Sequence, residues 1–204
     1  MPKPESIIIP GPAGALETVV HMPGAAPHGI AVIAHPLPTQ SGTMEHKIVT
    51  TLAKAFTELG FAALRFNFRG VGTSTGTYDN GLGEIEDSVA VANHARATFG
   101  DLPLILSGFS FGGYVQACAA RQLNPQHLVL IAPAVARFNM PSVPDHTLVI
   151  HGEIDEVIPL SEALQWARPQ HLPIVVIPDT GHYFHGQLHK IRELVRHYFI
   201  GHSL

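Results

Sequence analysis

Ser110 is flanked by glycines in the sequence Gly-Phe-Ser-Phe-Gly at residues 108–112. A short apolar run at residues 104–106 precedes this segment, and residues with helical spacing follow it. In such a G-x-S-x-G arrangement the serine lies on a sharp turn between a strand and a helix, with its hydroxyl exposed. The glycines suit the turn because a Cβ there would meet the neighbouring strand or helix. The pattern predicts a nucleophilic Ser110, and a phosphate-binding or purely structural glycine turn is the alternative.

A serine hydroxyl becomes a good nucleophile when a histidine accepts its proton and a carboxylate orients that histidine. Two downstream loops carry such groups, each after an apolar run: His-Gly-Glu-Ile-Asp-Glu-Val-Ile-Pro at residues 151–159 and Asp-Thr-Gly-His-Tyr-Phe at residues 179–184. The carboxyl ends of parallel strands meet at one edge of a sheet, where α/β proteins bind ligands. We therefore expect Ser110, Asp155 and His182 to converge there.

Neighbouring residues compete for these roles. Glu153 and Glu156 flank the aspartate and are alternative acids, and His185 is an alternative base three residues after His182. Asp179 also lies close to the histidine, but Asp-Thr-Gly is typical of a turn.

A metal or an organic cofactor is a further possibility that the sequence does not favour. The chain has 14 histidines, and His182, His185 and His189 have the spacing of possible metal ligands. No H-E-x-x-H motif accompanies them, and Cys118 is the only cysteine. The glycines within residues 70–76 resemble a dinucleotide fingerprint, but the third is one position late. We expect neither metal nor cofactor.

The elements that must position these residues follow from hydrophobic periodicity. Apolar runs predict strands at residues 30–34, 61–66, 104–106, 128–131, 148–150 and 174–177, after an antiparallel pair at 7–9 and 16–21. Helical spacing predicts helices over about 48–59 and 85–99, and others starting near residues 111, 159 and 188. Runs that are apolar at consecutive positions indicate strands covered on both faces. The alternation predicts an α/β fold with a mostly parallel sheet and helices on both faces.

One connection is too short for a crossover helix of ordinary length. About a dozen residues join the strand ending near Ile131 to the strand starting near Thr147, and Pro133, Pro141 and Pro144 interrupt them. We therefore expect no cap domain over the carboxyl edge of the sheet.

Composition bounds the remaining possibilities. With 204 residues, 46% of them hydrophobic and 14% charged, the chain fits one soluble globular domain over residues 1–204. No apolar run approaches the roughly 18 residues that span a bilayer, so we expect no membrane insertion.

The net charge of −4 argues against nucleic acid as a partner. The amino-terminal residues lack the apolar stretch of a secretory signal, which predicts a cytoplasmic location. Oligomeric state is left open.

Taken together, residues 108–112, the Gly-x-x-Asp-x-x-Ile-Pro loop at 152–159 and the Gly-His pair at 181–182 resemble the α/β-hydrolase superfamily. The chain is most similar to its small, lidless, dienelactone-hydrolase-like serine hydrolases and esterases. The chain order Ser, Asp, His is the order of that superfamily. His-Pro-Leu-Pro at residues 35–38 and Asn-Phe-Arg-Gly-Val-Gly-Thr-Ser at residues 67–74 extend the resemblance to nearly the whole chain.

The resemblance implies a fold and a set of roles. The fold would be a lidless α/β-hydrolase fold. Ser110 would be the nucleophile, His182 the base and Asp155 the acid that orients it. The backbone N–H groups of Leu37 and Phe111 would form the oxyanion hole. True dienelactone hydrolases have a cysteine nucleophile where this chain has Ser110, so dienelactone itself is not implied.

These features predict a serine hydrolase that cleaves small carboxylic esters or thioesters through an acyl-enzyme on Ser110. The substrate would be a small molecule, and water would release the acyl group without a cofactor. An acyltransferase or a peptidase could use the same three residues. From another class of protein, the fold could serve as a non-catalytic binding module.

Overall fold

The computed structural model describes residues 2–201 and, within them, one eight-stranded sheet in the order β1-β2-β4-β3-β5-β6-β7-β8. In this order, every pair of adjacent strands from β4 onward is parallel. Strand β2 is antiparallel to both of its neighbours, β1 and β4. The strands are β1 Glu5–Gly11, β2 Gly14–His21, β3 Gly29–Ala34, β4 Phe61–Phe66, β5 Leu104–Phe109, β6 His127–Ile131, β7 Thr147–Gly152 and β8 Ile174–Ile177. The predicted mostly parallel sheet and its antiparallel edge pair are confirmed.

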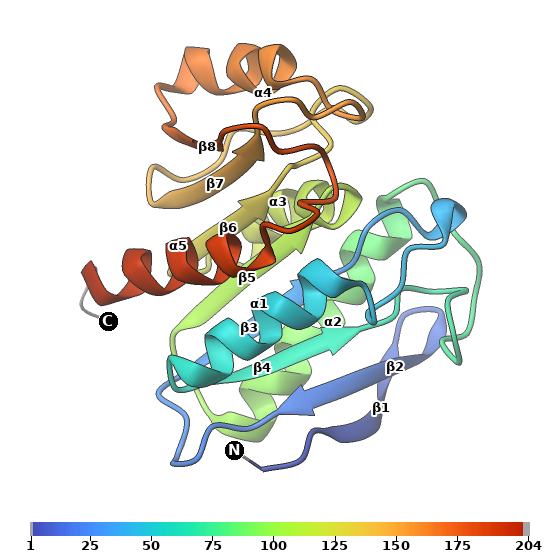
Figure 1. The fold of residues 1–204 in the computed structure, drawn as a ribbon. Helices are drawn as coiled ribbons and strands as arrows, with labels where there is room; N and C mark the ends of the chain where they lie inside the picture. Colours follow the sequence, from blue (N-terminus) through green and yellow to red (C-terminus); the bar gives the residue numbers. More distant parts are fainter. Residues whose placement is uncertain (1, 202–204) are drawn as a thin grey trace.

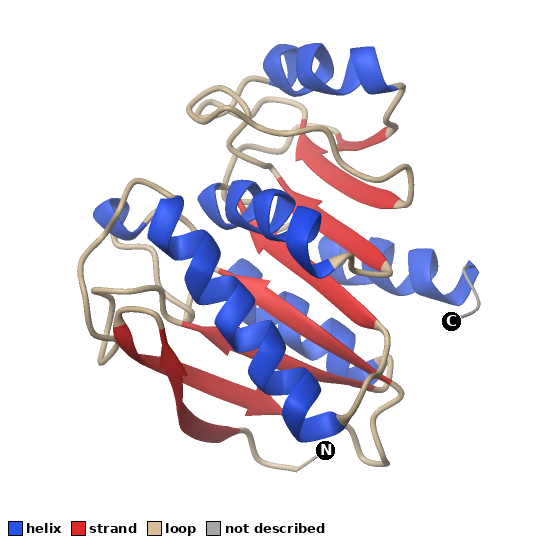
Figure 2. Ribbon diagram, turned by 180° about the vertical axis from the view of Figure 1, so that it is seen from behind, coloured by secondary structure: helices blue, strands red, loops and turns tan. Residues whose placement is uncertain are grey.

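Helices cover both faces of this sheet. They are α1 Lys47–Glu58, α2 Leu82–Phe99, α3 Phe111–Leu123, α4 Leu160–Ala167 and α5 Leu188–Gly201, with short 3-10 turns η1 Pro38–Gln40 and η2 Arg168–Gln170. Helices α1 and α5 lie on one face, and α2 and α3 lie on the other (Figures 1 and 2).

Alternate residues of the central strands enter two separate hydrophobic cores. Ile30 and Val32 of β3 pack under α2 and α3, whereas Ala31 and Ile33 pack under α1 and α5. A strand covered in this way must be apolar at consecutive positions, because its side chains point alternately to opposite faces. This explains why the central strands read as unbroken apolar runs.

The edge strand β8 departs from that expectation. Its sequence is as apolar as that of the central strands, but Val176 is 37% exposed and the two preceding residues are only half-buried. The expectation that both faces of this strand are covered is therefore wrong. Strand β8 lies at the edge of the sheet, which leaves one side of it exposed to solvent. The local sequence does not encode that position.

The connection between β6 and β7 contains no helix, as predicted. Residues 132–146 form turns and extended segments within the described chain, and Trp166 on α4 holds the connection by donating a hydrogen bond to the carbonyl of Pro141 at 3.1 Å. The direction of the crossovers instead reverses next to β3. The chain leaves β3 through α1 toward β4 and returns through α2 on the opposite face to β5, so the loops that follow β3 and β5 diverge. Such a point is where α/β sheets bind ligands.

Candidate active site

Ser110 lies on the turn between β5 and α3 with φ 53° and ψ −116°. A positive φ is strained for a residue other than glycine and persists where the surroundings enforce it. Here the Ser110 N–H donates to the carbonyl of Ile131 at 2.9 Å, which ties the turn to β6. A Cβ on Gly108 would lie 2.2 Å from the Gly112 carbonyl oxygen, and one on Gly112 would lie 2.4 Å from that of Ala34. Only glycines fit at these two positions.

The three residues predicted to converge do so. His182 Nε2 lies 3.1 Å from Ser110 Oγ, and His182 Nδ1 lies 2.8 Å from Asp155 Oδ2. Because a carboxylate can only accept, Nδ1 carries the proton and Nε2 is left to accept the serine proton. Ser110, Asp155 and His182 are all buried.

Asp155 is held in its ionised form. Its Oδ1 accepts hydrogen bonds from the N–H groups of Val157 at 2.9 Å and Ile158 at 2.7 Å. Burial raises the pKa of Asp155, but the hydrogen bonds from His182 and from these N–H groups outweigh it and hold the pKa below its ordinary value.

The competing residues have other contacts. Glu153 accepts a hydrogen bond from the N–H of Asp179 at 3.0 Å, and Glu156 accepts one from the N–H of His182 at 3.2 Å. Both carboxylates thus brace the backbone of the histidine loop. His185 is exposed, and no hydrogen bond joins its ring to Ser110 within residues 2–201.

The loop after β3 brings Leu37 to the same site. Leu37, Ser110 and Phe111 line one pocket. Within the described chain neither the N–H of Leu37 nor that of Phe111 donates a hydrogen bond. Phe111 is the first residue of α3, where helical N–H groups lack intrahelical partners and the helix dipole is positive. Both groups are thus free to bind a negatively charged oxygen.

His35 fixes this loop, a role that the sequence does not reveal. Its ring is fully buried; Nδ1 donates to the Pro36 carbonyl at 2.6 Å, and Nε2 accepts from the N–H of Phe68 at 3.1 Å. Burial lowers the pKa of His35 to about 3, so the ring is neutral at neutral pH. The side chain therefore joins the loop after β3 to the segment after β4.

Asn67 makes a second connection of this kind. Its Oδ1 accepts from the N–H of Met44 at 2.8 Å, and its Nδ2 donates to Glu17 at 2.8 Å. The Asn-Phe-Arg-Gly motif marks this segment in the sequence, but only the folded structure shows that its asparagine supports the loop leading into α1.

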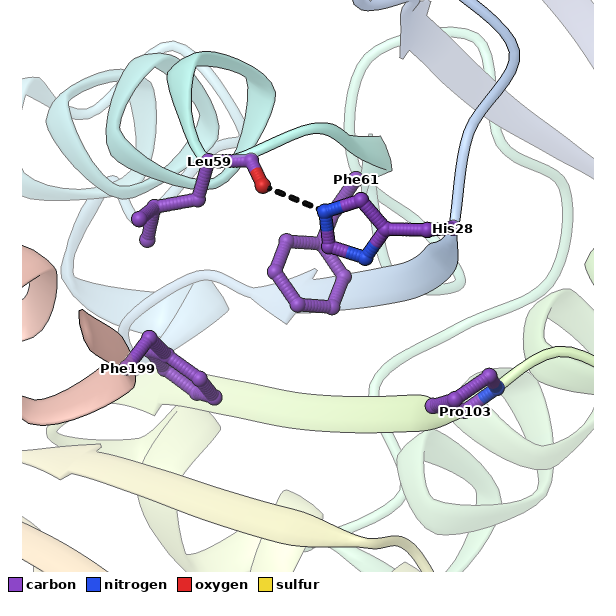
Figure 3. A pocket seen from close by; sticks show the side chains of 5 residues that line it. All are labelled: His28, Leu59, Phe61, Pro103 and Phe199. Carbon is purple, nitrogen blue, oxygen red and sulfur yellow. Dashed lines mark hydrogen bonds between the residues drawn. The ribbon is translucent and has the colours of Figure 1, made fainter. Parts of the chain in front are cut away.

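The pocket at Ser110 is small. Its cavity volume is about 10 Å³, which is near the minimum for one water molecule. A larger hollow of about 440 Å³ is lined by His28, Leu59, Phe61, Pro103 and Phe199 (Figure 3). It lies where β3, β4 and β5 begin, at the opposite edge of the sheet from Ser110. The larger hollow is therefore remote from the converging side chains.

Two further findings concern residues 2–201 as a whole. In this range no group of three or more His, Cys, Asp or Glu side chains is arranged to hold a metal ion. None of the helices in the same range is long and apolar enough to cross a membrane.

Comparison with known proteins extends these observations. Residues 25–148 match a family model described as serine aminopeptidase, S33. A lidless α/β serine hydrolase from Xanthomonas campestris is 39% identical, with a TM-score of 0.92 over 97% of this chain and 94% of the other. An α/β serine hydrolase homologue from Coxiella burnetii is 39% identical, with a TM-score of 0.89 over 95% and 96% of the two chains.

A more distant structure shares the fold alone. Est1E from Butyrivibrio proteoclasticus, in complex with ferulic acid, is 18% identical, with a TM-score of 0.82 over 96% of this chain and 98% of the other. The family match covers more than half of the chain, and both 39% identical structures cover almost all of it. The chain therefore belongs to the α/β-hydrolase superfamily, as a member of the serine hydrolases without a lid.

Proposed function

We propose that this protein hydrolyses small carboxylic esters or thioesters through an acyl-enzyme on Ser110. The observation that carries the proposal is the unbroken chain of hydrogen bonds from Ser110 Oγ through His182 to Asp155, with distances of 3.1 and 2.8 Å. Each group has the partner that its role in acyl transfer requires.

In the proposed first half-reaction, Ser110 Oγ attacks the carbonyl carbon while its proton passes to His182 Nε2. The electron pair of the carbonyl bond moves to oxygen, where the N–H groups of Leu37 and Phe111 stabilise the charge. When the tetrahedral intermediate collapses, the alcohol or thiol leaves and takes the proton from His182. Water then attacks the acyl-enzyme in the same way and releases the acid. Asp155 stabilises the imidazolium at both stages, and no step needs a cofactor.

The pocket beside Ser110 supports short acyl groups. It encloses too little space for a long chain, which would have to extend into solvent. The cytoplasmic location expected from the sequence stays a prediction.

Peptide hydrolysis is the second candidate, because the matching family model is described as a serine aminopeptidase. An aminopeptidase must hold the positively charged amino terminus of its substrate, which calls for a carboxylate near the nucleophile. The residues lining the Ser110 pocket include an arginine and no acid. This charge favours ester over aminopeptide substrates.

A fluorophosphonate probe tests the proposal, since it labels activated serines. We expect labelling of the wild-type protein and hydrolysis of p-nitrophenyl acetate, with Ser110→Ala losing the label and about 10⁴- to 10⁶-fold in kcat. Ser107→Ala is the matched control, because Ser107 Oγ is buried in β5 without a hydrogen-bond partner within residues 2–201. Labelling that persists in Ser110→Ala would remove Ser110 from the mechanism, and a wild-type protein that neither reacts nor hydrolyses would be a binding module.

A further inference from the structure

Arg137 lies in the connection between β6 and β7 and lines the same pocket as Ser110. The described residues around this pocket are otherwise uncharged: Leu37, Gln40, Ser110, Phe111, Ala134, Phe138, Val157 and Ile158. Arg137 is thus the one residue with a formal charge among those that line the pocket.

The side chain of Arg137 is exposed and makes no hydrogen bond or ion pair within residues 2–201. Arg65, Arg69 and Arg192 each pair with a carboxylate, whereas Arg121, Arg168 and Arg196 have no such pair in the same range, so it is the position of Arg137 beside Ser110 that sets it apart. A guanidinium offers five donors and cannot lose its proton in a protein, so a free one beside a reaction centre is suited to bind an anion.

The backbone around Arg137 is anchored to the nucleophile turn. The N–H of Ala134 donates to the carbonyl of Ser110 at 3.2 Å, and the N–H of Arg137 donates to the carbonyl of Ala134 at 3.3 Å. On the other side, the ring of Phe138 stacks on Tyr114 of α3 with centroids 4.6 Å apart. The guanidinium is therefore presented from a segment whose position is fixed relative to Ser110.

The net charge of the chain shows that Arg137 does not belong to a generally basic protein. The protein has a net charge of −4, so Arg137 is not part of a generally basic surface. The amino end of α3 adds a positive partial charge at the same pocket. A negatively charged substrate group would meet two attractive contributions there and no opposing carboxylate on the wall.

We propose that Arg137 is a specificity-determining residue that selects esters or thioesters carrying a second, anionic group such as a carboxylate or a phosphate. The proposal rests on the function proposed above and names its substrate class. The anionic group can belong to the acyl part or to the alcohol or thiol part, since both flank the reacting carbonyl.

Paired substrates that differ only in this charge test the proposal. For the acyl part we would compare the mono-p-nitrophenyl ester of glutaric acid with its methyl ester. For the alcohol part we would compare 4-carboxyphenyl butyrate with the corresponding methyl ester. The readout is the ratio of kcat/KM for the anionic substrate to that for the neutral one. Ser110→Ala supplies the background, because a glutarate carboxylate also attacks its own ester.

We expect Arg137→Gln to lower this ratio about 3- to 10-fold in one of the two pairs, mainly through KM, as for an exposed charge contact. Arg137→Lys should retain part of the preference, and Arg137→Glu should lower the ratio further. Arg121→Gln is the matched control: it removes the same charge from the last turn of α3, about 16 Å along the helix from Ser110.

The outcomes separate this proposal from the proposed function. Suppose that neutral esters are hydrolysed and that this hydrolysis depends on Ser110. If the ratio of kcat/KM for anionic to neutral substrate in Arg137→Gln then stays within twofold of wild type in both pairs, the Arg137 proposal is wrong and the proposed esterase function is retained. An equal loss for anionic and neutral substrates would make Arg137 structural and would also overturn the proposal. Absence of hydrolysis of all four esters by the wild-type protein would instead contradict the proposed function.

Discussion

Asp155 faces two buried histidines, and its contacts distinguish them. Its Oδ2 lies 2.8 Å from His182 Nδ1 and 3.5 Å from His151 Nε2, and the latter nitrogen lies 2.9 Å from the carbonyl of Ile158. Burial lowers the pKa of His151, which favours a neutral ring that donates to that carbonyl. The charge of Asp155 is therefore available to His182.

Asp155→Asn should therefore cost about 10³- to 10⁴-fold in kcat, because an amide can present its N–H to His182 and stabilise the wrong tautomer. Steady-state hydrolysis of p-nitrophenyl acetate measures the loss. Glu153→Gln is the control, since Glu153 is exposed and, within residues 2–201, the one hydrogen bond to its carboxylate comes from the N–H of Asp179. An active Asp155→Asn beside an inactive Glu153→Gln would transfer the role to the glutamate.

His35 should make stability depend on pH. Its pKa is about 3 in the folded protein, against an ordinary value of 6.5, so below pH 6.5 the unfolded chain binds a proton that the folded chain excludes. Stability from this group is complete above pH 6.5 and declines as the pH falls toward 3. Between pH 6.5 and 4.5 the decline amounts to about 2 to 3 kcal/mol.

Urea unfolding of wild type and His35→Gln at both pH values measures this decline. Glutamine can donate and accept as the neutral ring does but does not titrate, so the variant should show a smaller decline. His21, whose pKa burial lowers to about 4, has the same sign and is present in both proteins, so it cancels in the comparison. Equal declines in the two proteins would rule out His35 as the cause.

The sequence identifies Ser110, Asp155 and His182 as candidates because each follows an apolar run in a loop rich in turn residues, and one sheet edge must gather such loops. It does not identify the roles of His35 or Asn67 in the same way. Their partners Phe68, Met44 and Glu17 lie on other segments at large sequence separation, so only the folded backbone brings them together.

At the level of elements, the connection between β6 and β7 decides how open the site is. It has no helix and Trp166 ties it to α4, so residues 132–146 form no cap domain, and Ala134, Arg137 and Phe138 only line the pocket beside Ser110. Each CH₂ of an acyl chain that stays in water forgoes about 0.8 kcal/mol of binding. Long chains should therefore gain little over short ones.

We expect hydrolysis of acetyl to hexanoyl p-nitrophenyl esters, much weaker turnover of palmitoyl esters, and no jump in rate at the solubility limit, because interfacial activation needs a moving lid. A series of kcat/KM values against chain length, measured above and below that limit, checks this. Rates that climb steadily to long chains would reveal an acyl-binding surface elsewhere in the protein.

Strand and helix positions follow closely from hydrophobic periodicity, and β4 and β8 have the predicted bounds. The exposure of β8 cannot be predicted in this way, because an apolar run of four residues has the same sequence pattern at the centre and at the edge of a sheet. Strand order depends on how the crossovers assemble the whole sheet.

For the molecule as a whole, the alternation of strands and helices suffices to predict a mostly parallel sheet covered on both faces, since few arrangements bury that many apolar runs. That residues 1–204 form one domain stays a prediction. The sequence places the candidate residues at the carboxyl edge of the sheet but carries no signal for a large hollow at the opposite edge. The hollow in Figure 3 is far larger than the pocket at Ser110, yet Ser110, His182 and Asp155 meet at the opposite edge.

The placement of His182 on the loop after β8 has a consequence for how the proposed activity is lost during unfolding. Ser110 follows the buried strand β5, but His182 follows the edge strand β8, which is only partly buried and should open locally at a lower free-energy cost than β5. Opening that strand would separate His182 from Ser110 while both cores persist. In a urea titration we expect esterase activity to disappear at a lower concentration than far-ultraviolet circular dichroism, and amide exchange to be faster in β8 than in β5. Coincident midpoints would mean that the edge and the core unfold as one unit.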